Sequence, residues 1–253
     1  MAKVDEQLIA EELEQLVEFC AEFEHNPVGF VWAAYPWGEG ELAGKQPDEW
    51  QLNLLADIRD GLKGAGDVIQ EAIASGHGIG KSALVCFIIQ WAMATREDCK
   101  GVVTANTQNQ LLTKTWSELA KWHRLSICKP MFTYTATAYY SADGEHEKTW
   151  RIDALPWSKN NSEAFAGLHN QGKRILVVFD EASAIDDVIW EVVEGALTDS
   201  DTEIIWTAFG NPTKNSGRFY DCFHRYRAYW HTKQIDSRDV AVSNKKQLDK
   251  WIG

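Results

Sequence analysis

The order of apolar and polar residues divides the chain into two parts that follow different periods. Near the N-terminus, apolar residues from Ile9 to Phe23 recur at spacings of three and four, which predicts an amphipathic helix ending near Asn26-Pro27. From residue 67 onward, short β-rich runs alternate with helical windows. Strands that alternate with helices predict an α/β fold, with a mostly parallel central sheet and helices on both of its faces.

The individual elements follow from this alternation, after a stretch punctuated by Gly and Pro that begins at Pro27. Helices are predicted over 48–63, 81–95, 107–124, 186–197, 216–226 and 244–252, and strands over 67–74, 101–105, 131–139, 147–154, 174–179, 202–208 and 228–235. Two of the strands, RILVVF and TEIIWTA, are almost continuously apolar. Such runs are typical of central parallel strands that are buried on both faces.

Composition narrows the class of protein. The 253 residues are 45% hydrophobic and 25% charged, a balance that excludes a disordered or low-complexity chain. No apolar run approaches the roughly 20 residues of a membrane-spanning helix, and the acidic, amphipathic N-terminus is unlike a secretory signal. The five cysteines are widely spaced without a C-x-x-C pair, so neither a zinc ribbon nor a disulfide framework is predicted. These features favour an intracellular protein without a structural metal.

The net charge of −12 is unevenly distributed along the chain. Residues 1–50 hold 12 acidic and 2 basic residues, whereas the stretch 214–250 holds 9 basic and 4 acidic ones. Because a local basic patch can contact phosphates even in an acidic protein, 214–250 is the expected nucleic-acid contact, with a solvated charged surface as the alternative. The acidic N-terminal helix would repel DNA, so we expect it to face a partner protein or to pack on its own domain.

A glycine-rich segment joins the predicted strand 67–74 to the predicted helix 81–95, which is the context of a phosphate-binding loop. The residues expected to bind a nucleotide there are Ser75, Gly76, His77, Gly78, Ile79, Gly80, Lys81 and Ser82. The backbone N–H groups and the helix N-terminus would hold phosphate oxygens, Lys81 would reach the β- and γ-phosphates, and the Ser82 hydroxyl would bind Mg²⁺. The pattern G-x-x-x-x-G-K-[ST] has Gly at its first position, where this chain has Ser75.

A pair of carboxylates, Asp180 and Glu181, directly follows the apolar strand 174–179. Open α/β sheets bind ligands at the carboxyl ends of their strands, so the pair is expected to face the bound nucleotide. Asp180 is placed to hold Mg²⁺, and Glu181 to orient and deprotonate the water that attacks the γ-phosphate. Simple nucleotide kinases lack this pair, so it favours a P-loop ATPase of the additional-strand type.

Three weaker signals agree with an ATPase. The turn V-V-T-A-N-T-Q at 102–108 is of the kind that follows the P-loop helix in helicase-like ATPases. The segment T-A-F-G-N-P at 207–212 ends the next apolar strand, where a Thr or Asn side chain is placed to sense the γ-phosphate. Upstream of the loop, Gln51 is placed to hydrogen-bond an adenine edge and Trp50 to pack against the base.

Taken in order, these segments resemble the ATPase domain of the large terminase subunit of tailed bacteriophages, the motor that packages DNA into proheads. The segments are Trp50-Gln51, SGHGIGKS, VVTANTQNQ, AFAGLHNQGKR with ILVVFDEAS, and WTAFGNPT, followed by a linker-like IDSRDVAVSNKKQLDKWIG. The resemblance covers about residues 27–253. It implies an additional-strand P-loop NTPase fold of the RecA/helicase-like type. It also implies Gln51 as adenine contact, Lys81, Glu181 and Asn211 as catalytic residues, Ser82 and Asp180 as Mg²⁺ ligands, and 207–211 as the coupling segment.

The resemblance further implies the organisation and partners of the chain. Residues 1–60 would be a helical segment with the adenine-contact motif, 61–240 the P-loop ATPase core, and 241–253 the start of a linker. ATP and Mg²⁺ would be the cofactors, and double-stranded DNA, bound without sequence preference, the substrate of the motor. A portal protein, a small terminase subunit and further copies in a ring would be the protein partners. Such a virus-encoded protein would act in the cytoplasm of the infected host cell and would not be retained in the virion.

The sequence departs from the family pattern in two places. Many members have an Arg in the P-loop, where this chain has His77, so a charge-stabilising arginine finger would come from elsewhere, including a neighbouring subunit. The candidates, which the sequence does not separate, are Arg174, Arg151, Arg124 and Arg218.

The second departure is the missing nuclease. After the coupling segment only Asp221, Asp236, Asp239 and Asp249 remain, without a βαβ framework, so nuclease activity is not expected and the chain is interpreted as an ATPase domain cut from a longer protein.

Two alternatives remain beside the packaging motor. A superfamily-2-like helicase or remodelling ATPase would need a second RecA-like domain, for which the chain is too short. A nucleotide-gated assembly module would bind ATP and barely hydrolyse it. The Asp180-Glu181 pair argues against that module, because a carboxylate base is needed only for hydrolysis.

Overall fold

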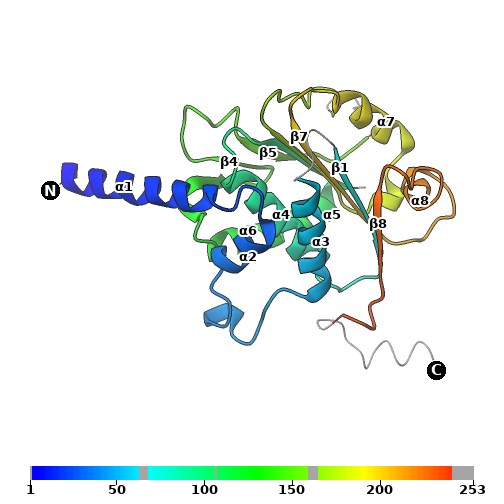
Figure 1. Ribbon diagram of the computed structural model, residues 1–253, viewed down its shortest axis with the longest axis horizontal. Helices are drawn as coiled ribbons and strands as arrows, with labels where there is room; N and C mark the ends of the chain where they lie inside the picture. The colour runs from blue at the N-terminus through cyan, green and yellow to red at the C-terminus, as the bar shows by residue number, and fades with distance from the viewer. Residues whose placement is uncertain (1, 63–67, 106, 159–164, 241–253) are drawn as a thin grey trace.

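The central feature of the protein is a mixed β-sheet with strand order β3-β4-β5-β2-β6-β7-β1-β8 (Figure 1). The computed structural model describes residues 2–62, 68–105, 107–158 and 165–240. The strands are β1 (Ile69–Ser75), β2 (Lys100–Thr104), β3 (Phe132–Tyr134), β4 (Ala138–Ser141), β5 (Arg151–Ala154), β6 (Arg174–Phe179), β7 (Glu203–Gly210) and β8 (His231–Ile235). Only β3 with β4 and β4 with β5 pair antiparallel, so the mostly parallel sheet predicted from the sequence is confirmed.

The order of the parallel strands identifies the type of P-loop fold. The loop that carries Lys81 follows β1, and the carboxylate pair follows β6. Strand β7 pairs with β6 on one side and with β1 on the other, so it separates the two. This inserted strand defines the additional-strand class, which confirms the expected fold.

Helices cover both faces of this sheet (Figure 1). The α-helices are α1 (Ala2–Ala21), α2 (Pro27–Ala34), α3 (Glu49–Gly61), α4 (Lys81–Ala94), α5 (Gln108–Gln110), α6 (Ser117–Leu125), α7 (Asp187–Ala196) and α8 (Arg218–Cys222). Between α5 and α6 the chain forms a π-helix, η2 (Leu111–Trp116), and short 3₁₀ turns occur at η1 (Gly40–Leu42), η3 (Lys129–Met131) and η5 (Ala182–Ala184). Helix α4 packs with α2 and α6 on one face, and α7 with α8 lies on the other.

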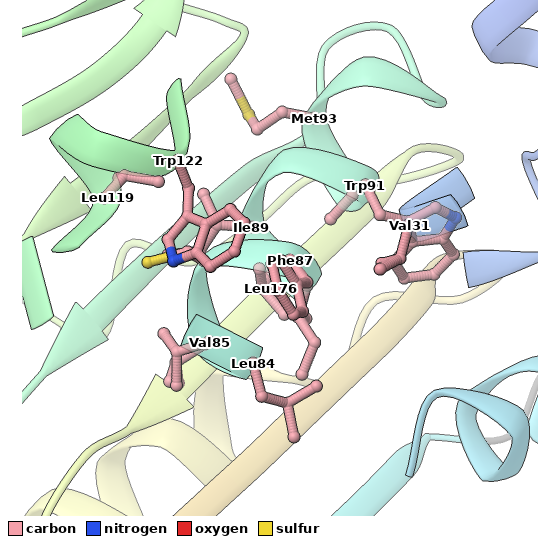
Figure 2. Close-up of a cluster of buried hydrophobic side chains, with 14 of the residues drawn as sticks. Val31, Leu84, Val85, Phe87, Ile89, Trp91, Met93, Leu119, Trp122 and Leu176 are labelled. Atoms are coloured by element: carbon pink, nitrogen blue, oxygen red, sulfur yellow. The ribbon is translucent and has the colours of Figure 1, made fainter. Parts of the chain in front are cut away.

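Alternation along β6 explains why its sequence is continuously apolar. Leu176 and Val178 belong to the core on the α4 face, whereas Ile175, Val177 and Phe179 belong to the core on the α7 face. Figure 2 shows the first core, in which side chains of α2, α4 and α6 meet Leu176. Because both faces are covered, neither set of side chains contacts water, and β6 holds its carboxyl end rigidly in place.

Several predicted elements need correction. The stretch after Asn26 contains helix α2, because the Asn26 side chain accepts a hydrogen bond from the Gly29 N–H at 3.0 Å and Pro27 occupies the first turn. The predicted strand 131–139 is instead two short strands, β3 and β4, joined by a turn in which the Thr135 N–H bonds to the Ala138 carbonyl at 2.8 Å. The predicted helix 216–226 is reduced to α8, and the predicted helix 244–252 lies outside the described residues.

The N-terminal helix α1 extends away from the body of the protein and packs on it through its C-terminal end (Figure 1). Cys20 is fully buried against the core, with its Sγ 3.4 Å from the Sγ of Cys128. Leu13 and Val17, earlier in the helix, are exposed. Across the described ranges, no helix has both the length and the apolar character that crossing a membrane requires.

Candidate nucleotide-binding site

The P-loop joins β1 to α4 and is shaped by two glycines in the left-handed region of backbone space. Gly78 has φ +72° and Gly80 has φ +87°, values at which a side chain would strain the backbone. Between them, Ile79 is fully buried and anchors the loop in the core. Two side chains of α3 brace the loop from outside, because Trp50 Nε1 donates to the Ile79 carbonyl at 3.1 Å and Gln51 Nε2 donates to the Gly80 carbonyl at 2.8 Å.

Gln51 is therefore tied to the loop itself. Its Oε1 accepts a hydrogen bond from the Asp48 N–H at 2.8 Å, which completes a capping box at the start of α3. The side chain is 5% exposed and keeps one N–H and one lone pair outside these two bonds. The predicted adenine contact stays a prediction, and the structure adds a bracing role that the sequence did not indicate.

Residues from several loops meet around a cavity of about 370 Å³ at the carboxyl edge of the sheet. Of the predicted loop residues, the cavity is lined by His77, Gly78, Gly80, Lys81 and Ser82, and not by Ser75, Gly76 or Ile79. Asp180, Glu181 and Asn211 complete the predicted set around it. The convergence expected from the ends of β1, β6 and β7 is thus present.

Asp180 is the most enclosed ionisable group of the site. Burial raises the pKa of this carboxyl, while the hydrogen bond from Thr115 and the positive charge of Lys81 act in the opposite direction. Its Oδ1 accepts from the Glu181 N–H at 3.0 Å, and its Oδ2 accepts from the Thr115 hydroxyl. Glu181 has φ +53°, an unusual value for a side chain that is not Gly, and it turns the second carboxylate into the cavity.

Lys81 connects the P-loop to the end of β7. Its Nζ donates to Asn211 Oδ1 at 3.0 Å, and Asn211 Nδ2 in turn donates to His77 Nε2 at 2.9 Å. Burial lowers the pKa of Lys81, an effect that the negative charges of Asp180 and Glu181 oppose. Thr207, the other predicted sensor in this segment, is fully buried within β7 and does not line the cavity, so Asn211 alone fits that role.

The donor set of the cavity fits the magnesium ion that the resemblance implies. The Ser82 hydroxyl and the Asp180 carboxylate line the same cavity. Both are hard oxygen ligands, and Mg²⁺ is commonly bound by one or two such protein groups together with phosphates and water. The residues that would hold the ion are therefore Ser82 and Asp180.

The four arginines named as finger candidates lie outside this cavity. Arg174 is fully buried at the start of β6, and Arg151 at the start of β5 pairs with Asp153 at 2.6 Å, so both lie at the opposite edge of the sheet. The remaining two are ion-paired nearer the surface, Arg124 with Glu41 and Arg218 with Glu194. Because Arg174 is inaccessible, it is excluded as a finger that reaches a neighbouring subunit.

Three residues in or next to the cavity were missed by the sequence analysis. Lys114, Thr115 and Glu118 come from η2 and α6, which follow β2. Lys114 and Glu118 line the cavity, and Thr115 contacts Asp180. One signal was available, since Leu111, Thr115 and Leu119 occupy one helical face and a Thr between two buried Leu residues is a polar group at a core position.

Comparison with known proteins supports the resemblance to the large terminase subunit. No protein-family model matches the chain. It is 30% identical over 189 residues to the probable terminase large subunit of Enterobacteria phage P7, a match that covers 73% of this chain and 36% of that protein. The chain thus spans about a third of the length of that relative.

Solved structures share the fold. The large terminase ATPase domain of Thermus phage P74-26 superposes with a TM-score of 0.55 at 16% identity, covering 83% of this chain and 88% of that one. The large terminase of a thermophilic bacteriophage, in complex with ADP, superposes with a TM-score of 0.59 at 12% identity, covering 81% of this chain and 49% of that one. The resemblance seen in the sequence is confirmed: the chain is related to a phage large terminase subunit, and its fold is the additional-strand P-loop fold of the terminase ATPase domains.

Proposed function

We propose that the chain is the ATP-hydrolysing motor domain of a DNA-packaging terminase. The observation that carries the proposal is the convergence of Lys81, Asp180, Glu181 and Asn211 on one cavity beside the P-loop. A structural P-loop would need no carboxylate turned into the cavity, whereas hydrolysis needs a base there. The bound nucleotides of the thermophilic phage relative, ADP in one structure and ATP-γ-S in another, agree with a nucleotide site in this fold.

The roles follow from the chemistry of each group. The loop N–H groups and Lys81 hold the β- and γ-phosphates, and Ser82 and Asp180 hold Mg²⁺, which neutralises the phosphate oxygens when bound. Glu181 takes a proton from the attacking water, so that the water oxygen forms the new P–O bond as the bond to the β-phosphate oxygen breaks. Asn211, bonded to Lys81, links the state of the terminal phosphate to the end of β7.

The proposed position of the adenine base is a second cavity, beside the Trp50 side chain that braces the P-loop. This cavity of about 560 Å³ lies between the start of α3 and the end of β8, and Trp50, Asn53 and Gln234 are among the residues that line it. Trp50 also supports the P-loop at Ile79. Gln51 follows Trp50 in α3 but does not line this cavity, so the proposed contact of Gln51 with the adenine edge would need its side chain to turn toward the base.

Double-stranded DNA is the proposed substrate of the motor, gripped through its phosphates without base contacts. In the described part of the basic stretch, Lys233 pairs with Asp57 and Arg238 with Asp236. The proposed phosphate contacts are therefore Lys214, Arg225 and Arg227. A portal protein, a small terminase subunit and further copies in a ring complete the proposed assembly, which acts in the infected host cell and does not remain in the virion.

The arginine finger is proposed to come from a neighbouring copy. None of the arginines in the described residues lines the 370 Å³ cavity. Such a finger accelerates hydrolysis by roughly 10³–10⁵ in well-studied P-loop proteins. The isolated chain should therefore hydrolyse ATP slowly, and assembly should raise the rate.

The test is steady-state ATP hydrolysis measured against protein concentration, with and without linear duplex DNA, and with Lys81→Ala as the blank. A rate per chain that rises with concentration and disappears in the blank supports a ring motor with a finger in trans. ATP binding without hydrolysis under all conditions would contradict the motor and favour the nucleotide-gated module. Full turnover in strictly monomeric protein would contradict the finger in trans.

A further inference from the structure

The two neighbouring carboxylates of the site are contacted by two neighbouring side chains of the π-helix η2. Thr115 donates its hydroxyl hydrogen bond to Asp180 Oδ2, and Lys114 Nζ lies 3.3 Å from Glu181 Oε1. The contacts bridge 65 and 67 positions of the sequence. Single π-helical turns are rare and occur frequently at functional sites, so this segment calls for a functional explanation.

The two contacts differ in how firmly they are held. Thr115 is fully buried, so its bond to Asp180 fixes η2 against the end of β6. The Lys114 side chain is 55% exposed and that of Glu181 is 31% exposed. An ion pair this exposed is weak and readily exchanged for a better partner. The backbone of η2 is therefore held in place at Thr115, while the Lys114 ammonium group is free to move within the cavity.

We propose that Lys114 recognises the terminal phosphate of bound ATP and, by moving onto it, releases Glu181 to act as the base. The inference rests on the proposed ATPase function and adds a cation supplied by the same chain. Lys114 lines the same cavity as Lys81 and Ser82, so a γ-phosphate held by the P-loop would share that cavity with the Lys114 ammonium. The phosphate oxygens, which carry more negative charge than one carboxylate, are the stronger partner for the ammonium.

The exchange distinguishes ATP from ADP. With ADP no terminal phosphate competes for Lys114, so the ammonium stays with Glu181 and the carboxylate remains paired. With ATP the ammonium leaves Glu181, whose freed oxygen can then accept a proton from the attacking water. Lys114 also acts on Lys81, because its positive charge adds to burial in lowering the pKa of that residue.

The experiment compares Lys114→Ala, Lys114→Arg and the wild type. Lys173→Ala serves as the matched control, since Lys173 is a partly exposed lysine that pairs with Asp98 at 3.5 Å, and neither residue lines the cavity. Two quantities are measured for each protein, the kcat and KM for ATP and the dissociation constants of ATP-γ-S and ADP. Thermal denaturation reports whether each variant is folded.

Lys114→Ala should lower kcat on the order of 10²-fold, as loss of a preorganised charge at a phosphoryl site does. It should weaken ATP-γ-S binding by about tenfold, the effect of one hydrogen bond to a charged group, and leave ADP binding unchanged. Lys114→Arg should recover most of both losses, and Lys173→Ala should match the wild type. A merely structural Lys114 would instead weaken both nucleotides equally or lower the melting temperature.

The outcomes separate this inference from the proposed function. If the wild type hydrolyses ATP, Lys81→Ala does not, and Lys114→Ala matches the wild type in kcat and in nucleotide preference, the role of Lys114 is overturned while the ATPase stands. If the wild type binds nucleotide without hydrolysis, the proposed function fails. The ratio of ATP-γ-S to ADP affinity then still decides whether Lys114 recognises the terminal phosphate. If neither nucleotide binds, both proposals fail.

Discussion

Charged side chains lie at both edges of the sheet, but the one at the start of β6 is buried and bonded, whereas those at the other edge face an open cavity. At the edge where the parallel strands begin, Arg174 is fully buried and its guanidinium makes four hydrogen bonds. At the edge where the strands end, Lys81, Lys114 and Glu181 line an open cavity with few partners each. A charged group that is buried with most of its hydrogen bonds made stabilises the fold. One that faces an open cavity with few partners can bind a ligand.

Arg174 is the buried group, with most of its hydrogen-bonding capacity used. Its Nε donates to Glu203 Oε2 at 2.8 Å, its other nitrogens reach the Thr95 hydroxyl at 2.8 Å and the Glu24 carbonyl at 2.9 Å, and the group lies 4.4 Å from the ring centre of Trp91. Burial acts to raise the pKa of Glu203, but the charge of Arg174, with hydrogen bonds from His25 and Arg174, holds that pKa below its usual value. Because the Arg174 side chain is fully buried and four of its five N–H groups are bonded, this network offers a ligand no access.

The largest effect is expected on turnover, when the proposed base Glu181 at the open edge is replaced. Glu181→Gln keeps the size of the side chain and removes the group that accepts the proton, so turnover should fall by roughly 10²–10⁴-fold with nucleotide binding retained. Single-turnover hydrolysis and equilibrium ATP-γ-S binding measure the two effects. Glu191→Gln, which changes an exposed acid on α7, is the control. Unchanged turnover in Glu181→Gln would remove Glu181 from the mechanism.

The next effect is on the stability of the protein and not on turnover, and it concerns the edge of the sheet that holds the buried Arg174. Arg174→Met should lower the free energy of unfolding by about 3–5 kcal/mol, because it leaves Glu203 without its buried partner. Chemical denaturation measures this. Arg151→Met is the matched control, since Arg151 begins strand β5 of the same sheet and pairs with the half-exposed Asp153, where loss costs about 0–1 kcal/mol. Equal losses in the two variants would contradict the difference between buried and exposed pairs.

The sequence predicted the open edge better than the closed one. Lys81, Asp180 and Asn211, which follow β1, β6 and β7, share one cavity because the carboxyl ends of parallel strands meet at one edge, whatever the details of packing. The role of Arg174 was not predictable, because an arginine at the start of a strand usually reaches solvent and its partners Glu24 and Glu203 are distant in sequence.

The π-helix was missed for a different reason. Over the six residues Leu111–Trp116, a π-helix and an α-helix have nearly the same apolar pattern, so the sequence predicted one continuous helix over 107–124. The contacts that reveal its function, from Lys114 and Thr115, depend on where β6 ends. Tertiary structure brings these groups together, and periodicity does not report it.

A smaller effect tests the link between Lys81 and β7. Asn211→Ala removes the acceptor that holds the Lys81 ammonium and the donor that reaches His77. We expect kcat to fall by about tenfold, the value of one hydrogen bond to a charged group. ATP-γ-S affinity should change less, since the loop N–H groups still hold the phosphates. Asn215→Ala, an exposed residue of the same loop, is the control, and equal kcat in both variants would contradict the link.

The last test concerns a carboxyl group that belongs to neither edge and whose effect on stability appears only as the pH rises. Glu71 lies within β1, is 2% exposed, and faces His231 of β8 at 3.1 Å. Burial raises the pKa of Glu71 from 4.5 to about 9, the negative charge of Asp57 adds to this rise, and the positive charge of Lys233 opposes it. The folded protein therefore binds this proton more tightly than the unfolded chain does.

A raised pKa fixes the sign of the pH dependence. The stabilisation from the protonated carboxyl is fully present below about pH 4.5 and is lost as the pH rises toward about 9. Gln resembles the protonated acid, so Glu71→Gln should match the wild type near pH 4.5 and be more stable at pH 8. Urea denaturation of both proteins at the two pH values measures this. The two proteins differ only at position 71, so the difference between their pH dependences reports on Glu71. A difference that does not grow with pH would show that Glu71 is ionised in the fold, with His231 and Lys233 as its counterions.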